Sequence, residues 1–245
     1  MFRLSFIGIV IVATSAAARA DDVKHGFVHR VHKDADGGES KYVLFVPHAY
    51  TGDKEFPLIL FLHGAGQRGD DGEGPARGGM ANGIRKYKGG EKEFPFFVIF
   101  PQCKTNGNWG AGGPNGKRAL AILDEVQKAY KIDDKRLYLT GLSLGGFGTW
   151  SLAAANPEKW AAIAPICGGG NPKTADKIKD LPCWCFHGDA DKTVDVKKSR
   201  DMIEALKKAG GNPRYSEYPG VGHNSWDRAY GTAELYSWFL SHKMK

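Results

Sequence analysis

Hydrophobic residues along the chain gather in short runs, and amphipathic stretches separate these runs. Residues 24–33 and 41–47 alternate apolar and polar side chains, which is typical of strands with one buried face. Later runs are continuously apolar and predict strands buried on both faces of a parallel sheet. They lie at 57–62, 96–100, 137–140, 161–166 and 182–186, and a last short strand is expected at 214–218.

Helical periodicity fills most of the segments between the apolar runs. Apolar side chains recur there every three or four positions, and glycine or proline follows two of the stretches. The expected helices are 117–131, 147–156, 194–209 and 225–242. Strands that alternate with helices predict an α/β domain, in which helices cover both faces of a mostly parallel sheet. Ligands of such sheets bind at the carboxyl ends of the strands.

Residues 1–20 differ from the rest of the chain and resemble an export signal. A positive charge near the start precedes an apolar core, and Ala18-Arg-Ala20 is a small-x-small cleavage site. The apolar core is too short for a permanent membrane helix, although a retained N-terminal anchor is the alternative. We therefore expect cleavage after Ala20, one domain at 21–245, no stable membrane insertion, and a secreted or periplasmic product.

Charge and cysteine content narrow the class of protein further. The formal net charge of +7 comes largely from lysines spread over helix faces and loops, so a nucleic-acid partner is not expected. The four cysteines lack zinc-ligand spacing, and no metal or other cofactor is expected. Cys183 and Cys185 lie too far apart along one strand for an easy bridge. Buried free thiols are therefore preferred to disulfides.

The apolar run at 137–140 leads directly into Gly141-Leu-Ser-Leu-Gly145, and a helix follows. Strand, G-x-S-x-G and helix in this order form a nucleophile elbow, a tight turn that lifts a serine above the end of a sheet. Side chains at Gly141 and Gly145 would obstruct the turn and the close approach of strand and helix. Ser143 is the candidate nucleophile, and a serine in an ordinary glycine-rich turn is the alternative.

A serine hydroxyl needs a base within hydrogen-bond reach. Among the eight histidines, His223 lies in a glycine-rich loop between the last strand and the last helix, from which it can reach the elbow. Capping of that helix is the alternative role. The imidazole in turn needs an acid to hold its tautomer. Asp189 and Asp191 both follow the strand at 182–186, and either could serve.

Four motifs together resemble the α/β-hydrolase superfamily. They are the segment 61–71, the elbow at 141–146, His187-Gly-Asp-Ala-Asp191 and Gly222-His-Asn-Ser-Trp226. The nearest branch is the phospholipase/carboxylesterase and dienelactone-hydrolase-like group of esterases and predicted peptidases. The resemblance extends from about residue 41 to the end of the chain. It implies the α/β-hydrolase fold, and the order Ser143, Asp191, His223 is the order of the triad in that fold.

The resemblance also chooses between the two acids and adds two backbone groups. In this group the acid stands three residues after the glycine of H-G-x-x-D, which selects Asp191 over Asp189. The resemblance places the two N–H donors of an oxyanion hole at Ala65, in the loop after 57–62, and at Leu144, just after the nucleophile. Dienelactone hydrolases themselves carry a cysteine nucleophile, so the serine here does not imply their reaction.

Three further side chains are candidates for substrate binding. Gln67 stands where related loops carry a glutamate, so the salt bridges of those loops are not implied. Trp109 lies in a loop rich in glycine and asparagine, where core packing is the alternative but explains it less easily, and we expect it to stack on an aromatic acid or a sugar ring. Trp226 begins the last helix, where core packing is the alternative. His63 is expected to support its loop rather than to perform chemistry.

The expected reaction is the hydrolysis of carboxylic esters through an acyl-Ser143 intermediate. Only residues 167–181 separate two strands at the point where lids are commonly inserted, so we expect an open site without a cap domain. Small-molecule or polysaccharide-linked esters with short-chain or aromatic groups, of feruloyl or acetyl type, are the expected substrates. A serine peptidase of prolyl-oligopeptidase-like type and a non-catalytic binding protein are the alternatives. The sequence does not indicate the oligomeric state.

Overall fold

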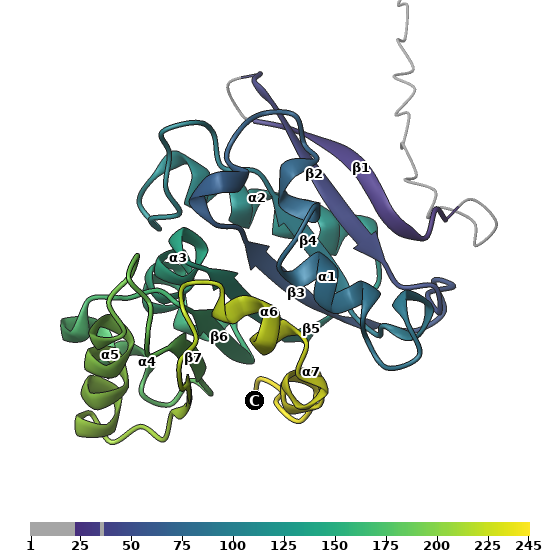
Figure 1. The fold of residues 1–245 in the computed structure, drawn as a ribbon. Coiled ribbons are helices and arrows are strands. Elements are labelled where there is room, and N and C mark those ends of the chain that lie inside the picture. Colours follow the sequence, from purple (N-terminus) through teal and green to yellow (C-terminus); the bar gives the residue numbers. More distant parts are fainter. Residues whose placement is uncertain (1–22, 35–36) are drawn as a thin grey trace, which may run out of the picture.

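The computed structural model describes residues 23–34 and 37–245, so the expected export signal at 1–20 lies outside the described residues. The described strands form one eight-stranded sheet in the order β1-β2-β4-β3-β5-β6-β7-β8 (Figure 1). The strands are β1 (Gly26–Lys33), β2 (Glu39–Val46), β3 (Phe56–Leu62), β4 (Phe97–Pro101), β5 (Ile132–Leu142), β6 (Ala162–Ile166), β7 (Trp184–Gly188) and β8 (Arg214–Tyr218).

Most of the sheet is parallel. Among the described strands only β2 runs opposite to the others, since it pairs antiparallel with both β1 and β4. β3 pairs parallel with β4 and with β5, and the parallel series continues through β6 and β7 to β8. Parallel strands bring their carboxyl ends to one edge of the sheet. The segments that follow β3, β5, β7 and β8 therefore meet at this edge.

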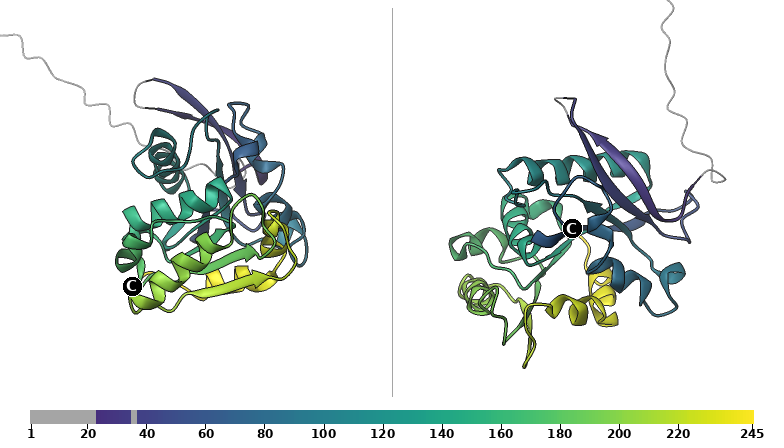
Figure 2. Two further views of the ribbon diagram at one scale, coloured as in Figure 1. Left: turned by 60° about the vertical axis from the view of Figure 1, so that its left-hand side comes forward. Right: turned by 45° about the horizontal axis from the view of Figure 1, so that its top comes forward.

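Helices cover both faces of the sheet, as the sequence predicts. They are α1 (Met80–Arg85), α2 (Pro114–Ala129), α3 (Leu144–Ala155), α4 (Ala175–Ile178), α5 (Lys197–Lys208), α6 (Ser225–Tyr230) and α7 (Ala233–Leu240). Buried residues of α2, α3, α4 and α5 share one hydrophobic cluster, and those of α1, α6 and α7 share the other. Figure 2 shows the two groups of helices on opposite sides of the sheet. The α/β-hydrolase architecture is thereby confirmed.

The central strands explain why two clusters form. Successive side chains of a strand point to opposite faces of the sheet. In β3, Leu58, Leu60 and Leu62 belong to the cluster under α2 and α3, whereas Ile59 and Phe61 belong to the cluster under α1 and α6. All residues of this strand are buried, which accounts for its continuous apolar run.

The C-terminal helix differs from the prediction. The sequence predicts one helix over 225–242, but the structure ends α6 at Tyr230 and begins α7 at Ala233. After the break, the Tyr236 hydroxyl returns to donate a hydrogen bond to the Tyr230 carbonyl at 2.7 Å. Gly83 of α1 packs so closely here that a Cβ atom would collide with the Tyr236 hydroxyl. The tertiary contacts of Tyr236 therefore favour two short helices over one long helix.

The connection between β6 and β7 contains only the short helix η6 (Pro172–Thr174) and the four-residue helix α4, and it forms no folded cap. All four cysteines are free and buried, which confirms the prediction of unpaired thiols. Within the described ranges, no helix has the length and hydropathy needed to cross a membrane.

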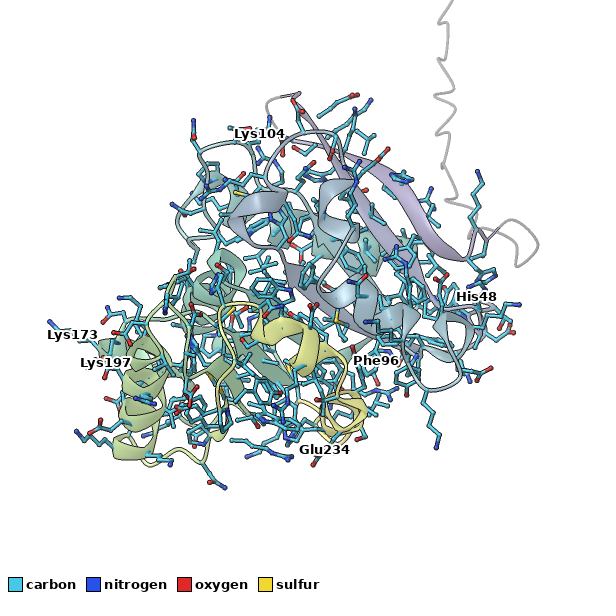
Figure 3. The ribbon with its side chains drawn as sticks, viewed as in Figure 1. His48, Phe96, Lys104, Lys173, Lys197 and Glu234 are labelled. Atoms are coloured by element: carbon cyan, nitrogen blue, oxygen red, sulfur yellow. The ribbon has the colours of Figure 1, made fainter. Side chains whose placement is uncertain are left out.

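The lysines lie on the outside of the molecule. Lys104, Lys173 and Lys197 project outward from three separate segments (Figure 3). Lys197 pairs with Asp201, one turn further along α5, and Lys208 likewise pairs with Glu204. Exposed pairs of this kind contribute little to stability, about 0–1 kcal/mol each. The positive charge of the chain is thus distributed over solvated helix faces.

Candidate active site

Ser143 lies in a sharp turn between β5 and α3. Its backbone has φ +53° and ψ −115°, a conformation that L-residues rarely adopt. The turn is stabilised by close backbone packing, which its flanking glycines permit because they have no side chains. A Cβ atom at Gly145 would collide with the Leu62 carbonyl, and the Ser143 N–H donates to the Ile166 carbonyl at 2.9 Å. The glycines of the G-x-S-x-G motif are therefore required by steric contacts with β3.

Three of the predicted side chains meet at this turn. His223 Nε2 lies 2.9 Å from Ser143 Oγ, and His223 Nδ1 lies 2.7 Å from Asp191 Oδ2. A carboxylate oxygen can only accept, so Nδ1 carries the proton and leaves Nε2 free to accept from the serine hydroxyl. Asp189 does not take part. It accepts the Gly220 N–H at 2.7 Å and so fixes the loop that leads to His223.

Asp191 is buried and held as an anion by four donors. Its Oδ1 accepts the N–H groups of Thr193 and Val194 at 2.8 and 3.0 Å, and its Oδ2 accepts from His223 and, at 3.2 Å, from His187. Burial opposes the charge, but the hydrogen bonds from His223 and from the two backbone amides outweigh it and lower the pKa of Asp191. The carboxylate is thus charged and fixed in orientation.

His187 is a second imidazole on this acid, and the sequence analysis did not assign it a role. Its Nε2 faces two acceptors, Asp191 Oδ2 and the Val194 carbonyl at 3.0 Å, so this nitrogen carries the proton. Its Nδ1 lies 2.7 Å from Ser199 Oγ. Burial lowers the pKa of His187, which keeps the ring neutral. In the sequence, the feature that could have identified His187 is its position as the first residue of the H-G-x-x-D motif.

A cavity of about 510 Å³ opens beside Ser143 and His223. One wall is formed by residues of η2 (Ala65–Gln67) and of the Arg77–Gly79 segment that precedes α1. Leu142 forms part of the floor and fits between two glycines, because a Cβ atom at Gly64 or at Gly79 would approach a Leu142 methyl group to 2.7 or 2.6 Å. Leu142 therefore contributes apolar surface to the cavity directly beside the serine.

Two backbone amides at this cavity have no acceptor within their own helices. Ala65 is the first residue of η2 and Leu144 the first residue of α3. The first N–H groups of a helix lack an intrahelical partner and point away from its N-terminus. Ala65 also lines the cavity, and Leu144 directly follows the serine at the cavity floor. These are the two residues that the sequence analysis names as oxyanion-hole donors.

The three residues expected to bind substrate have different surroundings. Trp226 lines the cavity, with its ring edge-on to His223 at a centroid distance of 5.3 Å. Gln67 also lines the cavity, but its side chain bonds within its own loop. Its Oε1 accepts the Gly64 N–H at 3.3 Å, and its Nε2 donates to the Gly74 carbonyl at 3.2 Å. Gln67 thus holds the wall in shape.

The structure corrects the expectation for Trp109. This side chain is only 1% exposed and does not line the cavity. Its Nε1 donates to the His63 carbonyl at 2.9 Å, and the side chain packs against α3 at Gly148, where an added Cβ atom would collide with the Trp109 Cβ. The loop after β4 therefore folds beneath the end of β3 instead of reaching the substrate cavity, which places the indole in the core.

Among the described residues, no group of three or more His, Cys, Asp or Glu side chains is arranged to hold a metal ion. The cavity brings together the Ser143 hydroxyl, the His223 imidazole with its Asp191 partner, and two backbone amides. This set can activate a nucleophile, transfer its proton and stabilise a developing negative charge.

The chain is similar in sequence to a family of hydrolases and to several named esterases. Residues 110–230 match the model of the dienelactone hydrolase family. A bifunctional acetylxylan esterase/xylanase of Neocallimastix patriciarum is 29% identical over 58% of this chain and 21% of its own length. Feruloyl esterase D of Neurospora crassa is 25% identical over 86% of this chain and 74% of its own length. The chain spans less than half of the first three curated relatives that it matches.

Two solved esterase structures are also similar to this chain in fold. The crystal structure of a thermostable esterase is 34% identical, has a TM-score of 0.81, and aligns over 92% of this chain and 64% of its own. A ferulic acid esterase structure is 14% identical with a TM-score of 0.68, covers 86% of this chain and 95% of its own, and supports the fold alone. Residues 110–230 are thus similar to the dienelactone hydrolase family, and the fold is that of an α/β-hydrolase.

Proposed function

We propose that the protein is a serine carboxylesterase that cleaves esters through an acyl-Ser143 intermediate. The observation that carries this proposal is the hydrogen-bonded series Ser143, His223, Asp191 at the wall of the cavity. A neutral imidazole within hydrogen-bond reach converts a weak hydroxyl into a nucleophile. The relatives named as esterases support ester hydrolysis.

The geometry suggests the following steps. His223 Nε2 accepts the hydroxyl proton as Ser143 Oγ attacks the ester carbonyl carbon, and the carbonyl oxygen becomes an oxyanion held by the N–H groups of Ala65 and Leu144. The protonated His223 then gives its proton to the departing alkoxide, and the alcohol leaves. Water, deprotonated by the same nitrogen, attacks the acyl carbon. The Oγ–acyl bond then breaks, Ser143 Oγ takes the proton back from His223, and the carboxylic acid leaves. Asp191 stabilises the imidazolium in both halves of the reaction.

The proposed substrates are small-molecule or polysaccharide-linked esters with short-chain or aromatic groups. A cavity of about 510 Å³ with Trp226 in its wall has room for an aromatic ring, and Leu142 offers an apolar floor. Relatives named acetylxylan esterase and feruloyl esterase support this class. We also propose export through the segment 1–20, with a hydrolase domain at 21–245. One relative, from Arthroderma benhamiae, is named as an uncharacterized secreted protein.

Substitution of the serine tests the proposal. Ser143→Ala removes the nucleophile, so kcat for 4-nitrophenyl acetate should fall by several orders of magnitude, to about 10⁻³ or less of the wild-type value. A fluorophosphonate probe should label the wild type and leave the variant unlabelled. Retention of more than about a tenth of the activity would place the nucleophile elsewhere. Faster turnover of peptides than of esters by the wild type would favour the peptidase alternative.

A further inference from the structure

A buried pair of side chains, His63 and Trp109, holds the backbone just before Ala65. We propose that these two residues position the oxyanion hole: His63 orients the Ala65 N–H through the Gly64 carbonyl, and Trp109 fixes its distance from the Leu144 N–H. This inference rests on the proposed esterase function, in which these two amides bind the oxyanion.

The hydrogen bonds of His63 determine its tautomer. Cys103 N–H donates to His63 Nε2 at 2.9 Å, and a backbone N–H can only donate, so Nε2 is unprotonated. The proton therefore resides on Nδ1, which donates to the Gly64 carbonyl at 2.6 Å. Burial lowers the pKa of His63 to about 4, so the neutral ring persists at neutral pH. His63 is thus a fixed donor to Gly64.

The Gly64 carbonyl determines where the Ala65 N–H points. The described chain contains no cis peptide bond, and in a planar trans peptide the carbonyl and the following N–H point in opposite directions. The Gly64 oxygen points toward the protein interior, where it accepts hydrogen bonds from His63 Nδ1 and, at 3.2 Å, from the Gln67 N–H. The N–H of Ala65 consequently points away from the protein interior. Ala65 is exposed and lines the cavity, so this is the direction of the substrate.

Trp109 connects the preceding peptide, between His63 and Gly64, with the helix that carries the other donor. Its Nε1 donates to the carbonyl of His63 at 2.9 Å, and its ring meets the His63 ring edge-on at 5.0 Å. Its Cβ and Cγ atoms also pack against α3 at Gly148, one turn after the helix begins at Leu144. One rigid indole therefore spans the loop that carries Ala65 and the helix that begins with Leu144. Together with the direct packing of Gly145 on the Leu62 carbonyl, the indole fixes the separation of the two donors.

The two side chains act on the transition state and leave substrate binding unaffected. Neither His63 nor Trp109 lines the cavity, so neither can contact the substrate. An oxyanion hole operates only when its donors lie about 2.7–3.1 Å from the oxyanion, and loss of one donor costs roughly 10²–10³-fold in kcat. Misorientation of Ala65 should therefore lower kcat, whereas KM should change little.

Two substitutions of His63 separate its two hydrogen bonds. The amide nitrogen of Asn lies near the position of Nδ1 and can still donate to Gly64, whereas the longer Gln reaches the position of Nε2 and can still accept from Cys103. His63→Gln should lower kcat by about 30-fold or more with KM within about threefold, and His63→Asn should lower kcat by less than about tenfold. Both variants lose the same ring, so similar thermal midpoints provide the matched control.

An inhibitor that mimics the tetrahedral intermediate provides a measurement that does not depend on folding stability. A trifluoromethyl ketone adds to Ser143 Oγ and forms a hemiketal oxyanion, so its affinity should fall in proportion to kcat/KM in His63→Gln. Trp109→Phe keeps an aromatic ring against Gly148 but removes the donor to His63. It should lower kcat and inhibitor affinity together, by about tenfold.

Three outcomes would overturn the proposal. They are an equal loss of kcat in His63→Asn and His63→Gln, losses that follow the thermal midpoints, and an unchanged affinity for the ketone in Trp109→Phe. If either His63 variant fails to fold, the ketone affinity and kcat of Trp109→Phe test the proposal without them. Absence of ester turnover by the wild type would instead reject the proposed function, and Ser143→Ala distinguishes that failure from the failure of the positioning role.

Discussion

At the scale of single residues, Asp191 and Asp189 have the same chemistry and different partners. Asp191 is 8% exposed and accepts from His223, whereas Asp189 is exposed and accepts only from a backbone N–H in the loop before that histidine. Their proposed roles thus depend on contacts made after folding. The family spacing indicates which of the two is the acid, and the contacts give the physical reason.

Substitution of each aspartate should separate these roles. Asp191→Asn presents an amide that favours the wrong imidazole tautomer, so kcat should fall by roughly 10³–10⁴-fold. Asp189→Asn keeps an oxygen that can accept the Gly220 N–H, so kcat should remain within about tenfold. Steady-state kinetics with 4-nitrophenyl acetate measure both effects. The reverse ranking would reject Asp191 as the acid.

Sequence reasoning identifies residues whose environment is local. Ser143 is recognisable because the strand, the glycines and the helix that determine its geometry all lie within a few positions of it. The prediction for Trp109 was wrong because its hydrogen-bond partner, His63, lies 46 positions earlier in the chain. No pattern around an indole between Asn and Gly indicates that contact. His187 opens the H-G-x-x-D motif, but its hydrogen bonds to Ser199 and Val194 form only in the folded chain, so its role was missed.

At the scale of elements, the segment before α1 contains two adjacent glycines that serve different purposes. Gly79 has φ +55°, and a Cβ atom there would lie 2.6 Å from a Leu142 methyl group. A Cβ atom at Gly78 would meet no heavy atom within 4 Å, although the residue lines the cavity. Packing therefore requires one glycine, whereas the other leaves space for substrate.

Alanine at these two positions should have distinct effects. Gly79→Ala should lower the free energy of unfolding by roughly 1–3 kcal/mol, through its backbone strain and its contact with Leu142. Gly78→Ala should leave the free energy of unfolding within about 0.5 kcal/mol and raise KM for cinnamate esters more than for acetate. Urea unfolding and ester kinetics test this pair. Equal destabilisation by both substitutions would contradict the assignment.

The element predictions succeed where a segment is strongly patterned. The buried runs of β3, β4, β6 and β7 were placed to within about two residues, because strands buried on both faces are continuously apolar. The helix α1 was not predicted, since its sequence Met-Ala-Asn-Gly-Ile-Arg is too short for a period to be visible. The break between α6 and α7 depends on the packing of Tyr236 against Gly83, which only the folded chain contains.

At the scale of the whole molecule, buried neutral histidines link stability to pH. The pKa of His63 is lowered from 6.5 to about 4, mainly by burial, and burial also lowers the pKa of His187. A group whose pKa is lower in the folded state binds protons first in the unfolded state. The contribution of each histidine is therefore fully retained above about pH 6.5 and is lost as the pH falls.

Acid should destabilise the protein before its carboxylates titrate. For His63 alone the loss between about pH 6.5 and pH 4 amounts to about 3 kcal/mol. Urea unfolding of the wild type at several pH values in this window measures the loss. His63→Gln, which lacks the titrating ring, should show a shallower dependence on pH. A dependence of equal slope in both proteins would assign the effect to other groups.

The open site predicts how activity responds to an interface. The connection between β6 and β7 holds only η6 and α4, and the His223 side chain is already 22% exposed. No opening step is then needed before a soluble ester binds. The rate with tributyrin should rise smoothly through its solubility limit, and long-chain triglycerides should be poor substrates. A jump in rate when droplets appear would contradict this prediction.

The order of strands in the sheet has a consequence for how activity arises during folding. The serine follows β5, the acid β7 and the histidine β8, and β5 pairs with β3 and β6 in parallel register. Parallel pairing joins segments far apart in sequence and so forms slowly. A nascent chain that ends before β8 contains the nucleophile and the acid but lacks the base. Regain of ester hydrolysis in a refolding experiment should therefore lag behind the recovery of helical signal.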